Sequence, residues 1–204
     1  TKTKEVAQTA ALFAVLESNG KAGVVVFTDP SSLYSIAKSN EIVETIKLCQ
    51  TCSLLALEEM PLIASSEKMP ATLANLAKTH SPKKWTHTIA VNDLYIDAMS
   101  TPAAESALGD VKMQALSAGD GSESAYKRIH NKKLQVGTVP EPLQLQAWQL
   151  VDELNRAFSN EKPSLYTTPA YVVTNQNMAY HGGPNNHFDP DTGFRNEYKK
   201  IWGK

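Results

Sequence analysis

The chain has 204 residues, of which 42% are hydrophobic and 20% charged, a balance typical of a globular protein. Its 20 basic and 21 acidic residues give a net charge of −1, which favours neither nucleic acid nor an acidic membrane surface as a partner. No apolar run approaches the roughly 18 residues that a membrane-spanning helix needs.

Helical and strand patterns alternate along most of the chain. In chain order, the hydrophobic spacing predicts a helix at 4–18, a strand at 22–28, a helix at 33–47, a strand at 52–57, a helix at 70–80, a strand at 87–91, a helix at 94–108 broken near Pro102, a strand at 111–116, a helix at 122–131, a strand at 135–139, a long amphipathic helix at 143–159 and a short strand at 170–174. Pro70 is expected to open its helix, because proline is favoured at the first helical position.

This alternation predicts an α/β fold with a doubly wound parallel sheet. The strands lack polar alternation, as expected where helices cover both faces of a sheet. Residues 178–204 are polar and rich in turn formers, so we expect an irregular tail that lies on the surface. Its anchors would be the aromatic residues Phe188, Phe194, Tyr198 and Trp202.

Polar side chains stand at the ends of five predicted strands. In open parallel sheets, ligands bind in the crevice beyond the carboxyl ends of the strands, so these groups predict a site for a small polar ligand. Taken singly, Asp29, Asp93 and Asp120 are also good candidates for helix N-caps. The strand-end groups are Asp29, Glu58, Glu59, Asn92, Asp93, Asp120 and Glu141.

The order of these elements resembles the second lobe of a type I periplasmic solute-binding protein, the ribose- and galactose-binding family. Lys21–Thr28 is similar to the family's first strand in this lobe, "GKxxVVVFxG". Ala90–Asp93 is similar to "xxNDxxAxGA" and Leu116–Gly121 to "VxGFDG". Gln135–Glu161 is similar to the hinge and helix that follow, and Tyr171–Thr174 to the closing "xxxVTxxN".

The resemblance implies that Asn92 and Asp120 hydrogen-bond a ligand hydroxyl and that Glu141 lies near a ligand-binding glutamine. The family's ligand-binding arginine has no counterpart; Tyr34 or Lys38 is nearest to its place. Together with the strand-end residues Asp29 and Glu58, the predicted ligand-binding set is Asn92, Asp120, Glu141, Asp29, Tyr34 and Glu58.

The same resemblance divides the chain into a second lobe at 1–134, a crossover segment at 135–161 that packs on the first lobe, a return strand at 162–177 and the tail at 178–204. The first lobe itself is missing. We therefore expect that the chain is a fragment or that a second chain supplies the partner lobe. The long helix should then expose an apolar face through Leu143, Leu150, Leu154 and Phe158.

The implied function is that of a non-enzymatic, cofactor-free module that binds a small polar solute for delivery to an ABC-type membrane permease. Its implied location is periplasmic, with a signal peptide in the precursor. Two alternatives share this fold: a sensor input domain for a signalling receptor, and the effector domain of a lactose-repressor-type regulator. The 204 residues show no helix-turn-helix that would indicate the regulator.

Cys49 and Cys52 form a C-x-x-C pair that lies after a helix and before a strand. A thioredoxin-type site needs the pair after a strand, at a helix N-terminus, so we predict a structural disulfide without a redox role. Its Cα atoms should lie about 4.4–6.8 Å apart. The tail residues His181, His187, Asp189 and Asp191 fit no standard metal-ligand spacing, so we predict no metal site.

Overall fold

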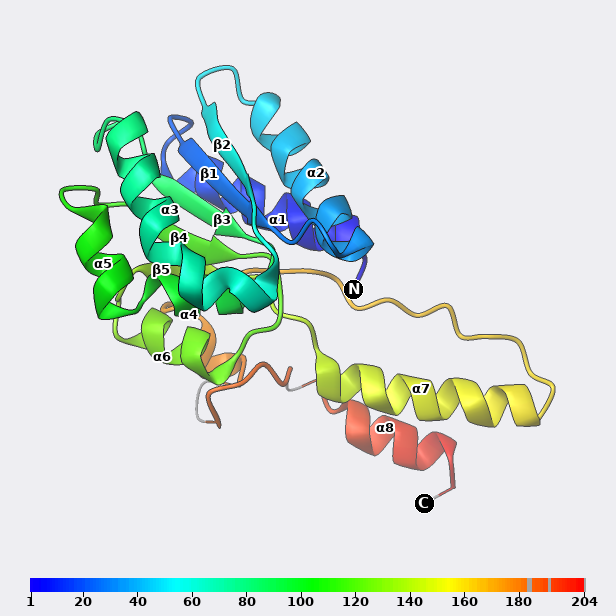
Figure 1. The fold of residues 1–204 in the computed structure, drawn as a ribbon. Coiled ribbons are helices and arrows are strands. Elements are labelled where there is room, and N and C mark those ends of the chain that lie inside the picture. The colour runs from blue at the N-terminus through cyan, green and yellow to red at the C-terminus, as the bar shows by residue number, and fades with distance from the viewer. Residues whose placement is uncertain (183–184, 191, 204) are drawn as a thin grey trace.

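The computed structural model describes residues 1–182, 185–190 and 192–203, in which helices and strands form one α/β layered unit with a two-helix extension (Figure 1). The strands are β1 (Gly23–Thr28), β2 (Ser53–Glu59), β3 (His87–Ala90), β4 (Gln114–Ser117), β5 (Gln135–Thr138) and β6 (Val173–Thr174). The α-helices are α1 (Thr3–Glu17), α2 (Leu33–Lys47), α3 (Ser65–Thr79), α4 (Asp93–Met99), α5 (Pro102–Leu108), α6 (Glu123–His130), α7 (Leu143–Phe158) and α8 (Phe194–Ile201), and short 3-10 turns lie at Leu62–Ala64 and Met178–Tyr180.

The sheet has the strand order β2-β1-β3-β4-β5-β6. The first five strands run parallel, and β6 pairs antiparallel with β5. The order therefore confirms the predicted doubly wound α/β fold. Because β2 and β3 lie on opposite sides of β1, the chain reverses its direction of winding there, and such a switch point is where open α/β sheets bind ligands.

Helices cover both faces of the sheet. α1 and α2 pack together on one face, and α3, α4, α5 and α6 lie on the other (Figure 1). The central strands β1 and β3 are buried throughout, whereas the edge strand β2 is partly exposed. The apolar run of β1 is thus explained by cover on both sides.

Several element boundaries differ from the sequence prediction, and β4 and β6, for example, begin three residues later than expected. α3 begins at Ser65, five residues before Pro70, and this proline lies inside the helix. Met69, Leu73 and Leu76 are buried on one face, so packing of that face outweighs the backbone hydrogen bond that Pro70 cannot make. β2 also continues through Glu58 and Glu59, which lie within the strand and not beyond its end.

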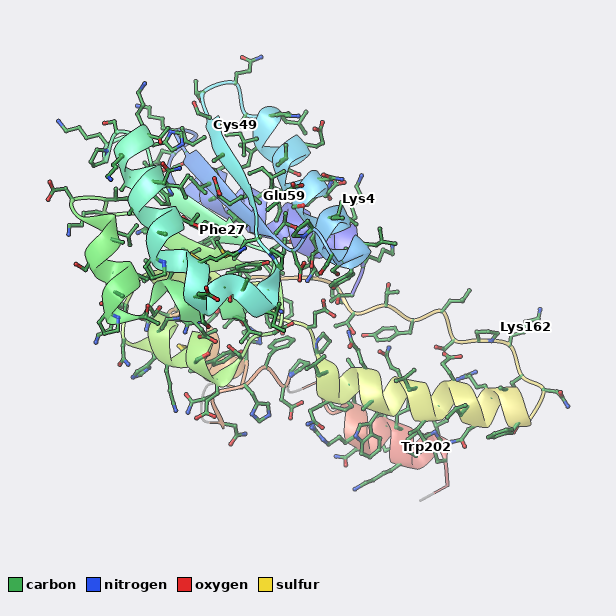
Figure 2. All side chains as sticks on the ribbon, in the orientation of Figure 1. Lys4, Phe27, Cys49, Glu59, Lys162 and Trp202 are labelled. Carbon is green, nitrogen blue, oxygen red and sulfur yellow. A yellow bond between two sulfur atoms is a disulfide. The ribbon has the colours of Figure 1, made fainter. Side chains whose placement is uncertain are left out.

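The prediction of a wholly irregular tail is wrong, because residues 194–201 form α8. Aromatic residues recur every fourth position at Phe194, Tyr198 and Trp202, which places them on one helical face. All three pack on Trp148 of α7, and the Trp148 and Trp202 rings stack 5.2 Å apart. Trp202 is labelled where α8 lies against α7 in Figure 2. A helix of eight residues is marginal alone, so this tertiary packing explains its formation.

α7 stands away from the sheet, with α8 beside it (Figure 1). The face of α7 that α8 leaves open carries large apolar side chains with exposed fractions between 46% and 82%: Leu143, Leu150, Val151, Leu154 and Phe158. The expected exposed apolar face is therefore present. That it packs on a first lobe stays a prediction.

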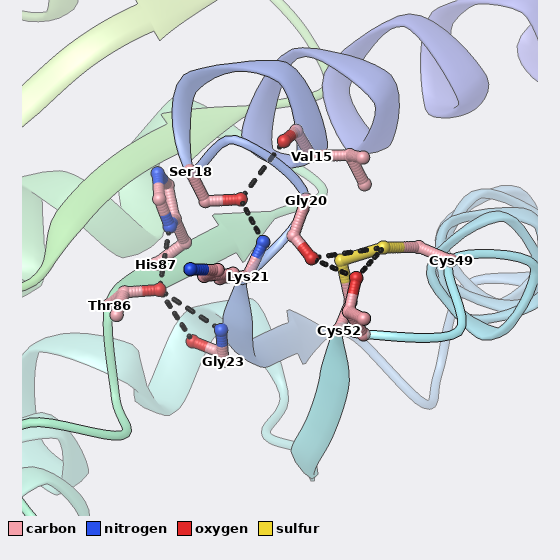
Figure 3. Close-up of a disulfide and its surroundings, with 10 residues drawn as sticks. Val15, Ser18, Gly20, Lys21, Gly23, Cys49, Cys52, Thr86 and His87 are labelled. Carbon is pink, nitrogen blue, oxygen red and sulfur yellow. Dashed lines mark hydrogen bonds between the residues drawn. A yellow bond between two sulfur atoms is a disulfide. The ribbon is translucent and has the colours of Figure 1, made fainter.

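The predicted disulfide between Cys49 and Cys52 is confirmed, with a Cα separation of 5.3 Å. It closes the short turn between α2 and β2, next to the Gly20 carbonyl group, which also accepts a hydrogen bond from the Thr51 hydroxyl (Figure 3). The disulfide thus lies at the amino end of the sheet. No helix in the described part of the chain is long and apolar enough to cross a bilayer.

Candidate ligand-binding site

Asn92 and Asp120 meet at the carboxyl ends of β3 and β4. The Asn92 Nδ2 group donates a hydrogen bond of 2.6 Å to Oδ2 of Asp120. Asn92 is also the N-cap of α4, since its Oδ1 accepts a hydrogen bond of 2.9 Å from the Leu94 amide. The strand-end prediction placed these two side chains together, and the structure does so.

Asp120 occupies a tight turn between two glycines. Its φ of 51° lies in the left-handed region, where aspartate is one of the few tolerated non-glycine residues. A Cβ atom at Gly119 would lie 2.9 Å from Nζ of Lys38, and one at Gly121 would lie 2.5 Å from Cβ of Pro140. The glycines let the backbone fit between these neighbours, so the turn fixes where the Asp120 carboxylate emerges.

Asp93 lies directly behind this turn and is completely buried. Its Oδ2 accepts hydrogen bonds of 2.9 Å from the amides of both Gly121 and Ser122. Its Oδ1 accepts from the Ser117 hydroxyl and from the side-chain amide of Gln135. Burial raises the pKa of the Asp93 carboxyl group, while these hydrogen bonds oppose the increase.

A second group of polar side chains joins α2 to the residue after β5. The Tyr34 hydroxyl donates a hydrogen bond to Oε1 of Glu141, and Nζ of Lys38 lies 3.5 Å from the same oxygen. Gln146 of α7 donates to the other carboxylate oxygen at 3.4 Å. Burial acts to raise the pKa of Glu141, but the hydrogen bond from Tyr34 and the charge of Lys38 outweigh it, so the pKa lies below its usual value.

Lys38 is 2% exposed, which is unusual for a lysine. Its ammonium group donates to the backbone carbonyl of Ala118 and lies 3.5 Å from that of Val91, so it bridges the ends of β3 and β4. Burial lowers the pKa of Lys38, although Glu141 and Asp120 act in the opposite direction. The sequence indicates Lys38 only as a residue near the place of the family's ligand-binding arginine, which has no counterpart in this chain.

The other predicted site residues are less closely connected. The Asp29 carboxylate already has hydrogen-bond donors within the protein. It accepts from the Ser31 amide and hydroxyl at 2.9 and 2.6 Å and from the Leu62 amide at 3.1 Å. These hydrogen bonds, first that from the Ser31 hydroxyl, lower the pKa of Asp29. Glu58 is half-buried on β2, and its side chain has no hydrogen-bond partner among the described residues. A ligand contact for either stays a prediction.

The alternative that Asp29, Asp93 and Asp120 are helix N-caps is wrong. The caps of α2, α4 and α6 are Ser32, Asn92 and Ser122, whose side-chain oxygens accept from helical amides. Asp93 is instead the first residue of α4, where its carboxylate can turn back toward the β4–α6 turn.

Asp120 and Glu141 differ in how much of each carboxylate remains free. Tyr34, Lys38 and Gln146 occupy both oxygens of Glu141, whereas Asp120 has Asn92 as its hydrogen-bond partner and no ion-pair partner in the described ranges. Asp120 therefore keeps acceptor capacity, and Asn92 keeps one N–H. Such a pair is suited to hydrogen-bonding a ligand hydroxyl, which both donates and accepts.

A hollow of about 820 Å³ lies elsewhere, at the amino ends of β4 and β5 beside the end of α1. Its lining is largely apolar, with Phe13, Leu16 and Val136 among its residues. We place the candidate site at the strand ends because the polar groups converge there, next to the switch point. In the described residues no three His, Cys, Asp or Glu side chains are grouped to hold a metal ion, and Asp191 of the tail lies outside them.

No protein-family model matches the chain, and no curated protein sequence matches it. Solved structures do match. An arabinose-binding protein from Geobacillus stearothermophilus superposes with a TM-score of 0.70 at 16% identity over 88% of this chain and 63% of its own. The fold is that of a type I periplasmic binding protein lobe. The predicted resemblance is therefore confirmed at the level of structure.

Two further structures support the same assignment. An ABC transporter periplasmic solute-binding protein from Actinobacillus succinogenes, with bound D-allose, has a TM-score of 0.73 at 14% identity over 87% of this chain and 61% of its own. A solute-binding protein from Agrobacterium vitis, with bound D-fucose, has a TM-score of 0.73 at 16% identity over 92% and 63%. The chain thus spans less than two thirds of these proteins, and identities this low establish the fold alone.

Proposed function

We propose that this chain is the ligand-binding lobe of a solute-binding protein that takes up a small polyhydroxylated compound and delivers it to an ABC-type permease. It acts by binding and release, without catalysis or a cofactor. The observation that carries the proposal is the Asn92–Asp120 pair at the carboxyl ends of β3 and β4, next to the switch point of the sheet. The structurally similar proteins with bound D-allose and D-fucose support a sugar or related polyol as the ligand class.

The remaining ligand contacts come from a partner lobe outside these residues. Two observations support this step. The chain spans 61–63% of the structurally similar binding proteins named above. In addition, α7 exposes a row of apolar side chains, among them Leu150 and Leu154, which a monomeric globular protein rarely leaves uncovered. Two-lobed binding proteins close around a solute, so each lobe supplies part of the contact set.

We further propose an extracytoplasmic location. The Cys49–Cys52 disulfide supports it, since disulfides persist chiefly in oxidising compartments. A receptor input domain would use the same lobe and location, and a lactose-repressor-type effector domain the same fold. No feature of the described residues favours either over transport.

The test is a titration of the isotope-labelled chain with L-arabinose, D-galactose and D-allose, followed by NMR. One lobe supplies only part of the contacts, so we expect weak binding, with a dissociation constant of about 1 mM or higher. The amide signals of Asn92, Asp120 and Gly121 should shift with at least one sugar.

The matched variants are Asp120→Asn and Glu44→Gln. Asparagine tolerates the left-handed backbone of position 120, so the first variant removes the charge without disturbing the turn. It should weaken binding about tenfold or more, because hydrogen bonds to charged groups contribute about 1.5–3 kcal/mol. Glu44 is exposed on α2, and its variant should bind normally. Sugar-induced shifts that cluster at the apolar hollow, or the absence of shifts with every sugar, would contradict the proposal.

A further inference from the structure

We propose that Asp93 is a positioning residue that holds the Asp120 carboxylate in its ligand-binding place. Gln135 donates a hydrogen bond to Asp93, and Arg128 fixes the orientation of the Gln135 amide. The inference rests on the proposed function only in taking Asp120 as a ligand contact. The sequence had singled out Asp93 as a helix cap or ligand-binding group. Neither role matches a carboxylate that is fully buried behind the turn.

The Asp93 side chain holds the turn through the backbone amides of the turn. Both amides that donate to its Oδ2, those of Gly121 and Ser122, follow Asp120 directly in the chain. The hydroxyl of Ser117, at the end of β4, donates to the other oxygen from the opposite side of the same turn. The carboxylate therefore ties together the two ends of the segment that carries Asp120.

Asn92 holds the same turn by its side chain. It precedes Asp93 in the chain and donates to Oδ2 of Asp120 at 2.6 Å. Two consecutive residues at the end of β3 thus fix one turn at two points, one on its backbone and one on the side chain that faces the site. This arrangement explains how Asp120 keeps a left-handed backbone with a defined carboxylate position.

The side chain of Gln135 has its orientation set by Arg128. Nε and Nη2 of Arg128 donate to Oε1 of Gln135 at 2.9 and 2.8 Å, which directs Nε2 of Gln135 toward Oδ1 of Asp93 at 2.9 Å. Asp97 of α4 pairs with Nη1 of the same guanidinium group. Nε2 of Gln135 also donates to Ser117 Oγ at 3.1 Å and to the Gly137 carbonyl group at 3.2 Å, so without Arg128 these contacts alone would keep the amide oxygen from turning toward the Asp93 carboxylate.

A purely structural role for Asp93 predicts different behaviour. A carboxylate that only stabilised the fold would, on removal, lower global stability and leave the Asn92–Asp120 contact intact in the molecules that remain folded. A positioning residue would, on removal, release that contact while the fold persists. The two roles are therefore separated by a signal from the contact itself.

The experiment follows the side-chain amide protons of Asn92 by NMR, together with hydrogen exchange of the Gly121 and Ser122 amides. In Asp93→Asn, an NH₂ group replaces one acceptor oxygen, so we expect the Asn92 side-chain signals to move toward their positions in unstructured peptides. Exchange of the two amides should accelerate at least tenfold, while core amides of β1 stay protected. The control is Asp152→Asn, which alters another buried carboxylate, on α7, paired with Arg156 and Trp202; it should leave both readouts unchanged.

A milder variant covers the case in which Asp93→Asn does not fold. Arg128→Met keeps the donors Gly121, Ser122 and Ser117 to Asp93 in place and removes only the two hydrogen bonds that hold Oε1 of Gln135. It should therefore loosen the fourth donor, the Gln135 amide, and shift the Asn92 signals in the same direction by a smaller amount. Unchanged Asn92 signals in a folded Asp93→Asn protein would overturn the inference. If Asp93→Asn does not fold, unchanged Asn92 signals in Arg128→Met would overturn it. Altered signals without any change in sugar binding would instead preserve the positioning role and contradict the ligand role of Asp120.

Discussion

The Nζ atom of Lys38 lies 3.5 Å from Oε1 of Glu141, which joins two residues separated by 103 positions in the sequence. The lysine is almost fully buried, and the glutamate side chain keeps 18% exposure. The pair connects α2 to the segment that leads from β5 into α7. It therefore links the candidate site to the helix with the exposed apolar face.

A double-mutant cycle on this pair is the first prediction. Lys38→Met and Glu141→Gln should each lower the free energy of unfolding, because each leaves the partner charge in a poorly solvated place. The double variant should be less destabilised than the sum of the two, with a coupling energy of about 0.5–3 kcal/mol. Urea unfolding at pH 7 measures all four proteins. Strict additivity would show that the ion pair has no energetic role.

Much of the fold was predictable because β1 is a short, almost entirely apolar run between clear turn residues, and because β3 follows the same helix–strand alternation. The start of α3 was not, since Pro70 is a strong local stop signal and the buried face of Met69 and Leu73 overrides it only through tertiary packing. α8 was missed for the same reason, because its stability depends on contacts with α7.

Part of the site was also predictable. Asn92 and Asp120 end neighbouring parallel strands, and that position alone brings them to one edge of the sheet. The role of Asp93 was hidden, because the pattern does not show toward which side a carboxylate at the start of a helix turns. One usable signal was overlooked: Gln135 is a polar residue in a buried strand, and such a group needs buried partners.

Removal of the disulfide is the second prediction. Cys49 and Cys52 are three positions apart. Closure of so short a loop lowers the entropy of the unfolded chain, which stabilises the folded protein by about 2 kcal/mol. The Cys49→Ser/Cys52→Ser variant should lose about that much unfolding free energy. It should keep its sugar-binding shifts, since the disulfide lies at the amino ends of the strands and Asp120 at their carboxyl ends. Wild-type protein in reductant should match the variant. A loss of binding in the variant would contradict this assignment.

The third prediction concerns acid sensitivity through His87, which is 3% exposed at the start of β3. Burial lowers its pKa below the usual value of 6.5, and the nearby Glu17 opposes that effect only in part. The unfolded chain thus binds a proton more readily, so the free energy of unfolding should fall as pH drops below 6.5 toward the lower folded pKa. Burial also lowers the pKa of His181, which adds in the same direction.

His87→Gln should flatten this dependence between pH 7.5 and 5.5, even though loss of the contacts with Thr86 and Glu17 lowers the stability at every pH. The measured quantity is the slope of unfolding free energy against pH, obtained from urea titrations. His181→Gln serves as the comparison and should retain most of the slope, because that ring is less buried. An unchanged slope in His87→Gln would place the sensitive group elsewhere.

The fourth prediction tests the open face of α7. Leu150 and Leu154 are 68% and 56% exposed, so replacing both with lysine should change the free energy of unfolding by no more than about 0.5 kcal/mol. The wild-type chain should self-associate at high concentration and bind a hydrophobic dye, because this face gathers several large apolar side chains in one place. The Leu150→Lys/Leu154→Lys variant should remain monomeric and bind less dye, as measured by analytical ultracentrifugation and fluorescence.

Leu48→Lys is the matched control, since Leu48 is 84% exposed but lies next to the disulfide turn, away from α7. This variant should associate like the wild type. If the wild-type chain stays monomeric and dye-free, or if the control loses association equally, the face of α7 is not the surface that a partner lobe covers.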